Sequence, residues 1–99
     1  MSKSVIWSPL AEIDLEKVLD YLEEEWNQQV ALGFLDKIEN LTSQICINPK
    51  QFPIINIKKK VRKCVVTKHN TIYYRERKKT IEILRVFDTR QDSKILRYK

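Results

Sequence analysis

The fold is decided by the stretch Ser8-Pro9-Leu10-Ala11-Glu12-Ile13-Asp14-Leu15, because a strand ends and a helix begins there. Val5-Ile6-Trp7 precedes it directly and favours a β-strand. Serine caps the free amides of a helix, and proline suits the first helical position. Apolar residues then recur every three or four positions as far as Trp26, with acidic residues between them. The spacing predicts an amphipathic helix that follows an N-terminal strand.

The same spacing resumes after Trp26-Asn27-Gln28 and continues to Asn48-Pro49. Because the residue before a proline disfavours the helical conformation, the second helix should end just before Pro49. Two helices joined by so short a connection must pack antiparallel, so residues 9–47 predict a helical hairpin.

Beyond Pro49, β-branched and aromatic residues alternate with short charged turns, which predicts strands at 54–57, 61–66, 71–77 and 80–87. In the last strand a period of two places Ile81, Ile83, Arg85 and Phe87 on one face and Glu82, Leu84 and Val86 on the other. The closely spaced turns indicate an antiparallel sheet, and the hairpin can cover only one of its faces. We therefore expect one α+β domain, residues 1–99, with an N-terminal strand and an antiparallel helical hairpin packed on a small antiparallel β-sheet.

Charge is divided unevenly along the chain. Residues 1–49 carry three basic and nine acidic residues, a net charge of −6, whereas residues 50–99 carry sixteen basic and four acidic residues, a net charge of +12. A polycationic segment attracts nucleic acids or acidic protein surfaces without specifying which. With 32% charged residues and no long apolar run or signal-like N-terminus, we expect a cytoplasmic protein without a membrane span.

Several kinds of chemistry lack the residues that they need. The single glycine rules out glycine-rich phosphate loops, and no spacing of His, Cys or acidic residues suggests a metal site, so we expect neither metal nor cofactor. The single histidine, His69, falls in a predicted turn, where a solvated role is the simplest interpretation. We expect Cys46 and Cys64 to be reduced, buried thiols.

Arginine and lysine remain as the functional candidates, because they bind phosphates or acidic protein surfaces. The candidates are Arg62, Arg75, Arg77, Arg85 and Arg90, together with Lys58 to Lys60, Lys63 and Lys68. Arg85, in register with core residues, is either a structural arginine paired with a carboxylate or the floor of a site. Of the neighbours Tyr73 and Tyr74, at least one must point into the core.

Several phrases, in this order and spacing, resemble the RelE/ParE superfamily of bacterial type II toxins. They are Val5 to Leu15, Tyr21-Leu22-Glu23 with Trp26, Asn48-Pro49, Val61-Arg62-Lys63, Ile72-Tyr73-Tyr74 and Ile83 to Asp92. The resemblance implies a helical hairpin on a small sheet. It also implies a toxin that a cognate antitoxin wraps and neutralises, as part of a hetero-oligomeric complex.

The superfamily divides by target. ParE-like members poison DNA gyrase without catalysis, whereas RelE-like members cut messenger RNA on the ribosome with lysines, arginines and often a C-terminal tyrosine. Thr71 stands just ahead of Ile72-Tyr73-Tyr74, where RelE-like enzymes tend to carry an arginine. This departure, with the Ser8-Pro9 opening and Arg90-Gln91-Asp92, favours the ParE-like branch.

Each branch predicts its own functional residues. For a ParE-like toxin we expect the target-binding residues to be Lys59, Lys60, Arg62, Lys63, Arg85 and Arg90. For the RelE-like alternative, the catalytic candidates are Arg90, Arg97 and Tyr98. A basic binding module without toxicity is the third hypothesis. All three predict an acidic, partly disordered partner segment that folds along the hairpin and the sheet edge.

Overall fold

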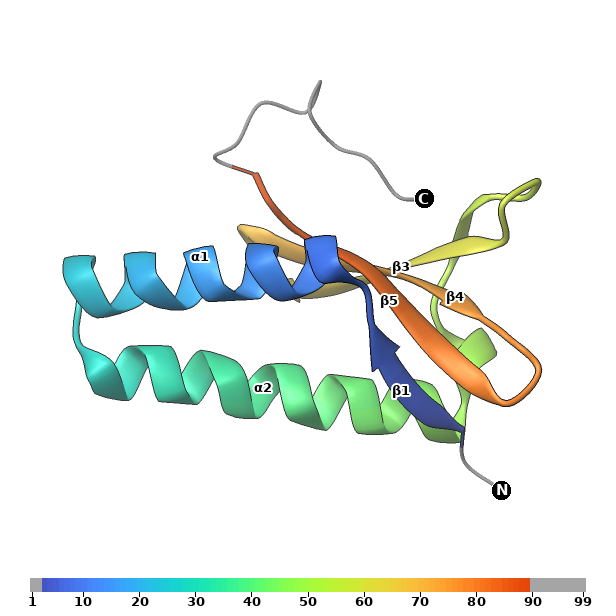
Figure 1. The fold of residues 1–99 in the computed structure, drawn as a ribbon, viewed down its shortest axis with the longest axis horizontal. Coiled ribbons are helices and arrows are strands. Elements are labelled where there is room, and N and C mark those ends of the chain that lie inside the picture. The colour runs from blue at the N-terminus through green and yellow to red at the C-terminus, as the bar shows by residue number, and fades with distance from the viewer. Residues whose placement is uncertain (1–2, 90–99) are drawn as a thin grey trace.

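The computed structural model describes residues 3–89 and shows an α+β fold, as the sequence predicts. Its elements, in chain order, are β1 (Ser4–Trp7), α1 (Pro9–Glu25), α2 (Gln28–Ile47), the 3-10 helix η1 (Pro49–Gln51), β2 (Ile54–Asn56), β3 (Val61–Thr67), β4 (Asn70–Glu76) and β5 (Thr80–Asp88). The two helices form the predicted antiparallel hairpin, and the strands form one twisted sheet beside it (Figure 1). No helix within residues 3–89 has the length and apolarity to cross a membrane.

Both helices begin at side-chain caps that the sequence specifies. The Oγ of Ser8 accepts a hydrogen bond from the backbone N–H of Ala11 at 3.0 Å, and Pro9 takes the first helical position. The Oδ1 of Asn27 accepts from the N–H of Val30 at 2.9 Å. A cap of this kind contributes about 1 kcal/mol, so the short break at residues 26–27 is enough to end one helix and start the next.

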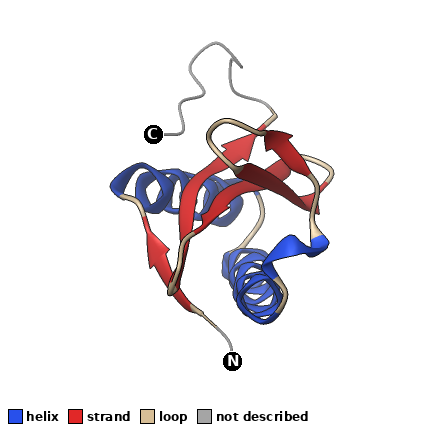
Figure 2. Cartoon of the chain, turned by 90° about the vertical axis from the view of Figure 1, so that its right-hand side faces the viewer, coloured by secondary structure: helices blue, strands red, loops and turns tan. Residues whose placement is uncertain are grey.

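The sheet has the strand order β1-β5-β4-β3-β2. Strands β2 to β5 pair antiparallel as predicted, but β1 pairs parallel with β5, from Ser4 opposite Thr80 to Trp7 opposite Ile83. The N-terminal strand therefore meets the last strand of the chain, and the sheet is mixed rather than purely antiparallel. In Figure 2, β1 lies at one edge of the sheet, as the strand order requires.

A β-bulge changes the predicted faces of β5. Tyr74 pairs with Ile83 and Tyr73 pairs with Arg85, so Leu84 is an extra residue between them. An extra residue inverts the alternation of side chains beyond it. The prediction that Arg85 shares a face with Ile81 and Ile83 is therefore wrong, because Val86 replaces it in the core. Phe87 packs edge to face on Tyr73, on the opposite side of the sheet.

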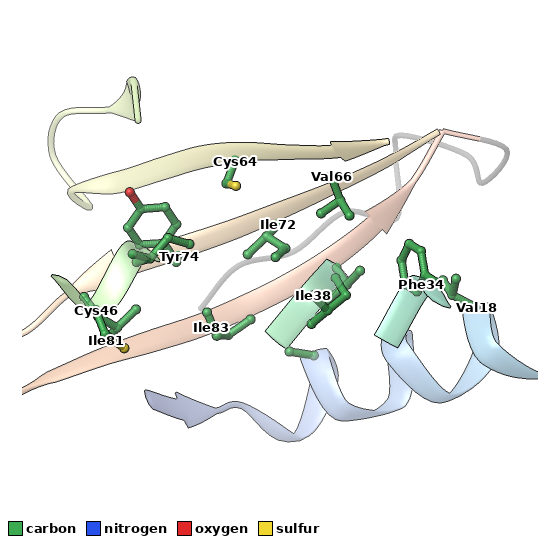
Figure 3. Packing of buried hydrophobic residues seen from close by; sticks show 13 residues of the cluster. Val18, Phe34, Ile38, Cys46, Cys64, Val66, Ile72, Tyr74, Ile81 and Ile83 are labelled. Carbon is green, nitrogen blue, oxygen red and sulfur yellow. The ribbon is translucent and has the colours of Figure 1, made fainter. Parts of the chain in front are cut away.

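The core lies between the helices and the inner face of the sheet (Figure 3). Phe34, Ile38 and Ile45 of α2 pack in one cluster with strand residues that include Ile72 and Ile83. Burying each such side chain contributes about 1.5–3 kcal/mol. Tyr74 is fully buried and is the tyrosine of the adjacent pair that enters the core, as required by the strand geometry.

Candidate functional site

Six cations from distant parts of the chain surround a groove of ≈ 590 Å³. They are Lys3, Lys50, Lys60, Arg62, Arg77 and Lys78. Ile54 and Ile57 add an apolar surface, and Glu76 is the one acidic residue in the lining. We call this surface the basic groove. Its residues come from the position before β1, from the segment that runs from η1 through β2 to the start of β3, and from the end of β4 with the turn into β5. These segments meet on the right-hand side of Figure 1.

The basic groove contains some of the sequence-predicted binding residues and excludes others. Lys60 and Arg62 line it, and Lys59 is exposed in the same turn as Lys60. Lys63 is half-buried on β3, in register with Tyr73, and does not line the groove. Arg90 lies outside the described residues, as do the RelE-type candidates Arg97 and Tyr98.

A tight turn between β2 and β3 presents Lys58 to Lys60. The side chain of Asn56 accepts a hydrogen bond from the N–H of Lys59 at 2.9 Å, and the carbonyl of Ile57 accepts from the N–H of Lys60 at 3.3 Å. Lys60 takes a φ of 58°, which is the left-handed region that most side chains avoid. The turn thus holds three consecutive lysines at the surface despite local strain.

Arg62 fixes the wall of the basic groove. Its Nη1 donates to the carbonyl of Phe52 at 2.6 Å, so the guanidinium ties β3 to the segment that follows η1. The hydroxyl of Tyr74 donates to the carbonyl of Pro49 at 2.6 Å and anchors the same segment from the core side. These two bonds hold Lys50 and Ile54 in place. Arg62 is therefore both a structural residue and a source of positive charge in the groove.

The sequence did not single out Lys50 of the basic groove, and it gave no sign that Lys3 lies there. The Nζ of Lys3 donates to the carbonyls of Arg77 and Lys78 at 2.6 and 2.8 Å, and it forms an ion pair with Glu76 at 3.3 Å. The chain distance of more than 70 residues hides this proximity, which follows from the parallel pairing of β1 with β5. Lys78 was only partly foreseen, because the sequence predicted an exposed turn at Lys78-Lys79 but no binding role for it.

Arg85 lies away from the basic groove and is bound internally. Its Nε and Nη2 donate to the two oxygens of Asp14 at 2.6 and 2.9 Å, and the exposed fractions of the two side chains are 9% and 6%. The hydrogen bond with Asp14 raises the pKa of Arg85. Of the two interpretations open from sequence, the geometry fits the structural arginine paired with a carboxylate.

The strongly buried titratable groups serve the core rather than a reaction. Burial raises the pKa of Cys64 to about 11 and that of Tyr74 to about 12, and it also raises the pKa of Cys46. None of these shifts brings a group toward neutral pH, where acid–base catalysis works best. His69 is exposed in the β3–β4 turn, 3.4 Å from the hydroxyl of Thr89. Residues 3–89 also contain no cluster of His, Cys, Asp and Glu that could hold a metal ion.

The fold is similar to solved toxin structures. A chain of the chromosomal ParDE toxin–antitoxin system of P. aeruginosa superposes with a TM-score of 0.74 at 20% identity, over 88% of this chain and 96% of that one. The RelBE2 toxin–antitoxin complex of Mycobacterium tuberculosis gives 0.60 at 16% identity, over 89% and 99%. The YoeB/ParE toxin of Agrobacterium tumefaciens gives 0.60 at 13% identity, over 86% and 97%. At these identities the likeness concerns the fold.

Sequence comparison gives the family itself. No curated protein is similar enough to this sequence to count as a match. A family model does match it, that of the ParE toxin of the type II toxin–antitoxin system parDE, and the match covers residues 5–93. It begins within β1, covers every later strand and helix described above, and reaches beyond β5. The chain therefore belongs to the ParE toxin family of type II toxin–antitoxin systems.

Proposed function

We propose that this ParE-family toxin inhibits DNA gyrase by binding to it, without catalysing a reaction of its own. The observation that carries the proposal is the match to the ParE model from residue 5 to residue 93. Thr71 supports it, because RelE-like nucleases tend to carry an arginine at that place. In the structure Thr71 lies on β4, paired with Val65 of β3 and Phe87 of β5. None of these three side chains is a cation of the kind that an arginine at position 71 would provide.

The basic groove is the surface that we assign to the target. Lys60 and Lys78 are exposed residues of its lining, and Ile57, with 79% of its surface exposed, offers an apolar contact in the same groove. Clustered positive charge speeds encounter with an acidic surface and fixes its orientation. The bonds of Lys3 and Arg62 to backbone carbonyls hold the groove in one shape before the target arrives.

The proposed function includes an antitoxin that binds this toxin in a hetero-oligomeric complex in the cytoplasm. Large apolar side chains stand exposed along the helical hairpin, among them Ile13 at 50%, Trp26 at 69% and Leu32 at 53%. Exposed apolar side chains gathered on one element are typical of a surface that a partner covers. The structural relatives that were solved as toxin–antitoxin complexes are consistent with such a partner.

A supercoiling assay with purified gyrase tests the proposed target directly. The toxin, separated from its antitoxin and refolded, is added to gyrase, relaxed plasmid and ATP, and the fraction of supercoiled and of cleaved DNA is measured. We expect loss of supercoiling and accumulation of cleaved DNA. The double variant Lys60→Glu/Lys78→Glu should lose this effect, while Lys17→Glu/Lys37→Glu, which changes the net charge equally at exposed positions outside the groove, should keep it.

The RelE-like alternative is tested in parallel with ribosomes and messenger RNA. Cleavage of the message in the ribosomal A site, together with normal gyrase activity, would replace the proposed function by that alternative. Loss of this cleavage on substitution of Arg90, Arg97 and Tyr98 would then identify the catalytic residues. Inhibition of neither system would favour the third hypothesis, a basic binding module.

A further inference from the structure

A second groove, of ≈ 520 Å³, lies between the connected ends of the two helices and the β3–β4 turn. We call it the tip groove. Tyr21 and Trp26 contribute from α1 and its end, Val30, Gly33 and Phe34 contribute from α2, and Asn70 contributes from the start of β4. The connection between the two helices is at the left-hand end of the hairpin in Figure 1. The tip groove shares none of its lining residues with the basic groove.

Three large apolar side chains stand exposed at the tip groove, which Lys37, Thr67 and His69 also line. Trp26 is 69% exposed, Val30 40% and Tyr21 39%. Aromatic side chains that stand in water beside a concave surface are the residues that most often carry binding energy in protein interfaces. Few contacts within the chain cover the Trp26 side chain, so most of its apolar surface is available to another molecule.

Gly33 is the only glycine in the chain, and it stands in the interior of α2. A glycine inside a helix is unfavourable relative to alanine, because it loses more backbone freedom on folding. No atom outside the helix backbone lies within 4 Å of the position that a Cβ would take. Neither φ nor internal packing therefore calls for glycine here. The bare helix surface in the tip groove instead permits the close approach of another chain.

Asn70 lines the tip groove and carries a buried hydrogen-bond donor without a partner. The residue is 5% exposed, and its Oδ1 accepts from the hydroxyl of Thr67 at 2.9 Å. Its Nδ2 is buried and has no hydrogen-bond partner within residues 3–89. Buried amide groups in folded proteins nearly always have a partner. Because Nδ2 is closed to water in this conformation, the side chain would have to turn toward the groove for a carbonyl oxygen of a bound molecule to accept from it.

We propose that the tip groove is the anchor site for one segment of the antitoxin. The segment places an apolar side chain among Trp26, Val30 and Phe34, passes its main chain over Gly33, and offers a carbonyl oxygen to Asn70. This inference rests on the proposed antitoxin partnership and adds the place and chemistry of one contact. An apolar anchor with a buried hydrogen bond dissociates slowly, which suits a neutralising partner, whereas a charged surface such as the basic groove mainly speeds encounter.

Binding of the toxin to its antitoxin, taken as the co-encoded protein that restores growth, tests the proposal. The dissociation constant is measured by calorimetry for the refolded full-length toxin and three variants. Gly33→Leu fills the groove and should weaken binding by at least about tenfold. Asn70→Asp keeps the size of the side chain but replaces the donor by an acceptor, and it should also weaken binding. Asn40→Leu adds the same side chain as the first variant at an exposed site of α2 outside the groove and should bind as the wild type does.

Circular dichroism and thermal melting distinguish a blocked groove from a damaged fold. Gly33→Ala should raise the melting temperature, since nothing obstructs the new methyl group, while it weakens binding less than leucine does. Wild-type affinity in folded Gly33→Leu and Asn70→Asp would overturn the proposal. Normal antitoxin binding with lost gyrase inhibition in those variants would overturn it too, because the groove would then serve the target. Failure of the wild-type toxin to bind the antitoxin would instead refute the partnership on which the proposal rests.

Discussion

Asp14 and Arg85, 71 positions apart in the chain, form a bidentate ion pair that fixes α1 to the edge of β5. The same carboxylate accepts a hydrogen bond from the backbone N–H of Val86 at 3.0 Å. Strand β1 pairs with β5 only from Thr80 to Ile83, so the rest of this strand edge needs other partners. Asp14 supplies one of them, and Ser8 supplies another by donating from its hydroxyl to the carbonyl of Leu84 at 2.8 Å.

Removal of one partner of this ion pair should destabilise the protein strongly. Asp14→Ala leaves a buried guanidinium and the amide of Val86 without their carboxylate, and we expect a loss of about 3–5 kcal/mol in the free energy of unfolding. Urea denaturation followed by circular dichroism measures it. The exposed substitution Asp20→Ala is the control and should change stability by about 0.5 kcal/mol at most.

The pair Asp14→Leu/Arg85→Met distinguishes a structural role from a functional one for Arg85. It replaces both charges by apolar side chains, so it should recover much of the stability that Asp14→Ala loses. If Arg85 is purely structural, the folded double variant also inhibits gyrase. Full stability together with lost inhibition would place Arg85 among the target-binding residues after all.

The positive φ of Lys60 predicts opposite effects at two neighbouring lysines. Glycine adopts the left-handed region without steric cost, so Lys60→Gly should raise the free energy of unfolding by up to about 1 kcal/mol. Lys59 has no positive φ, and Lys59→Gly should lower it by about 0.5–1 kcal/mol, since only backbone freedom changes. Equal effects of the two substitutions in urea denaturation would show that the turn carries no strain.

The buried thiol and phenol predict a loss of stability in alkaline solution. Burial raises the pKa of Cys64 from 9.0 to about 11, and that of Tyr74 from 10.0 to about 12. The folded state therefore holds protons that the unfolded chain releases. The stability from Cys64 is complete below pH 9 and lost as the pH rises to about 11, and that from Tyr74 is lost between 10 and about 12.

Urea midpoints measured from pH 8 to pH 11 check this alkaline loss. The midpoint of the wild type should fall as the pH rises through this range. Cys64→Ala should start from a lower midpoint, because it leaves a cavity, but should show a shallower fall between pH 9 and pH 11. Parallel curves for the two proteins would exclude Cys64 as a source of the pH dependence.

Salt dependence should separate the basic groove from the apolar tip groove. Inhibition of gyrase by the wild type should weaken as ionic strength rises, because surface charges are screened within about 8 Å at 0.15 M salt. Antitoxin binding at the tip groove should change less, since it depends on apolar burial and one buried hydrogen bond. Titration of both activities between low and high salt, with Lys17→Glu as the control toxin, measures the difference.

Local signals in the sequence were sufficient for most of the fold. Ser8-Pro9 and Asn27 set the helix starts, and the apolar spacing set the buried faces, because caps and periodicity act within a few residues. The parallel pairing of β1 with β5 and the bulge at Leu84 could not be read in the same way. The parallel pairing joins segments more than 70 positions apart in the chain. The bulge depends on how the edge of β5 meets α1, which no pattern within the strand reveals.

The candidate site was predicted less completely for the same reason. Lys60 and Arg62 stood out because they lie in a cluster of charge along the chain, and both line the basic groove. Lys3 gave no such signal, since only the folded sheet brings it to Arg77 and Lys78. Arg85 looked like a binding residue from its charge, but its partner Asp14 lies on another element.

A pulse-label comparison in bacteria tests the central claim, that this toxin acts on gyrase, most directly. The chain is induced alone, and incorporation of thymidine and of methionine is followed in parallel over the first minutes. We expect thymidine incorporation to fall early while protein synthesis continues, and the loss to disappear in Lys60→Glu/Lys78→Glu. An early fall in methionine incorporation with DNA synthesis intact would contradict the claim and would make Arg90, Arg97 and Tyr98 the catalytic candidates.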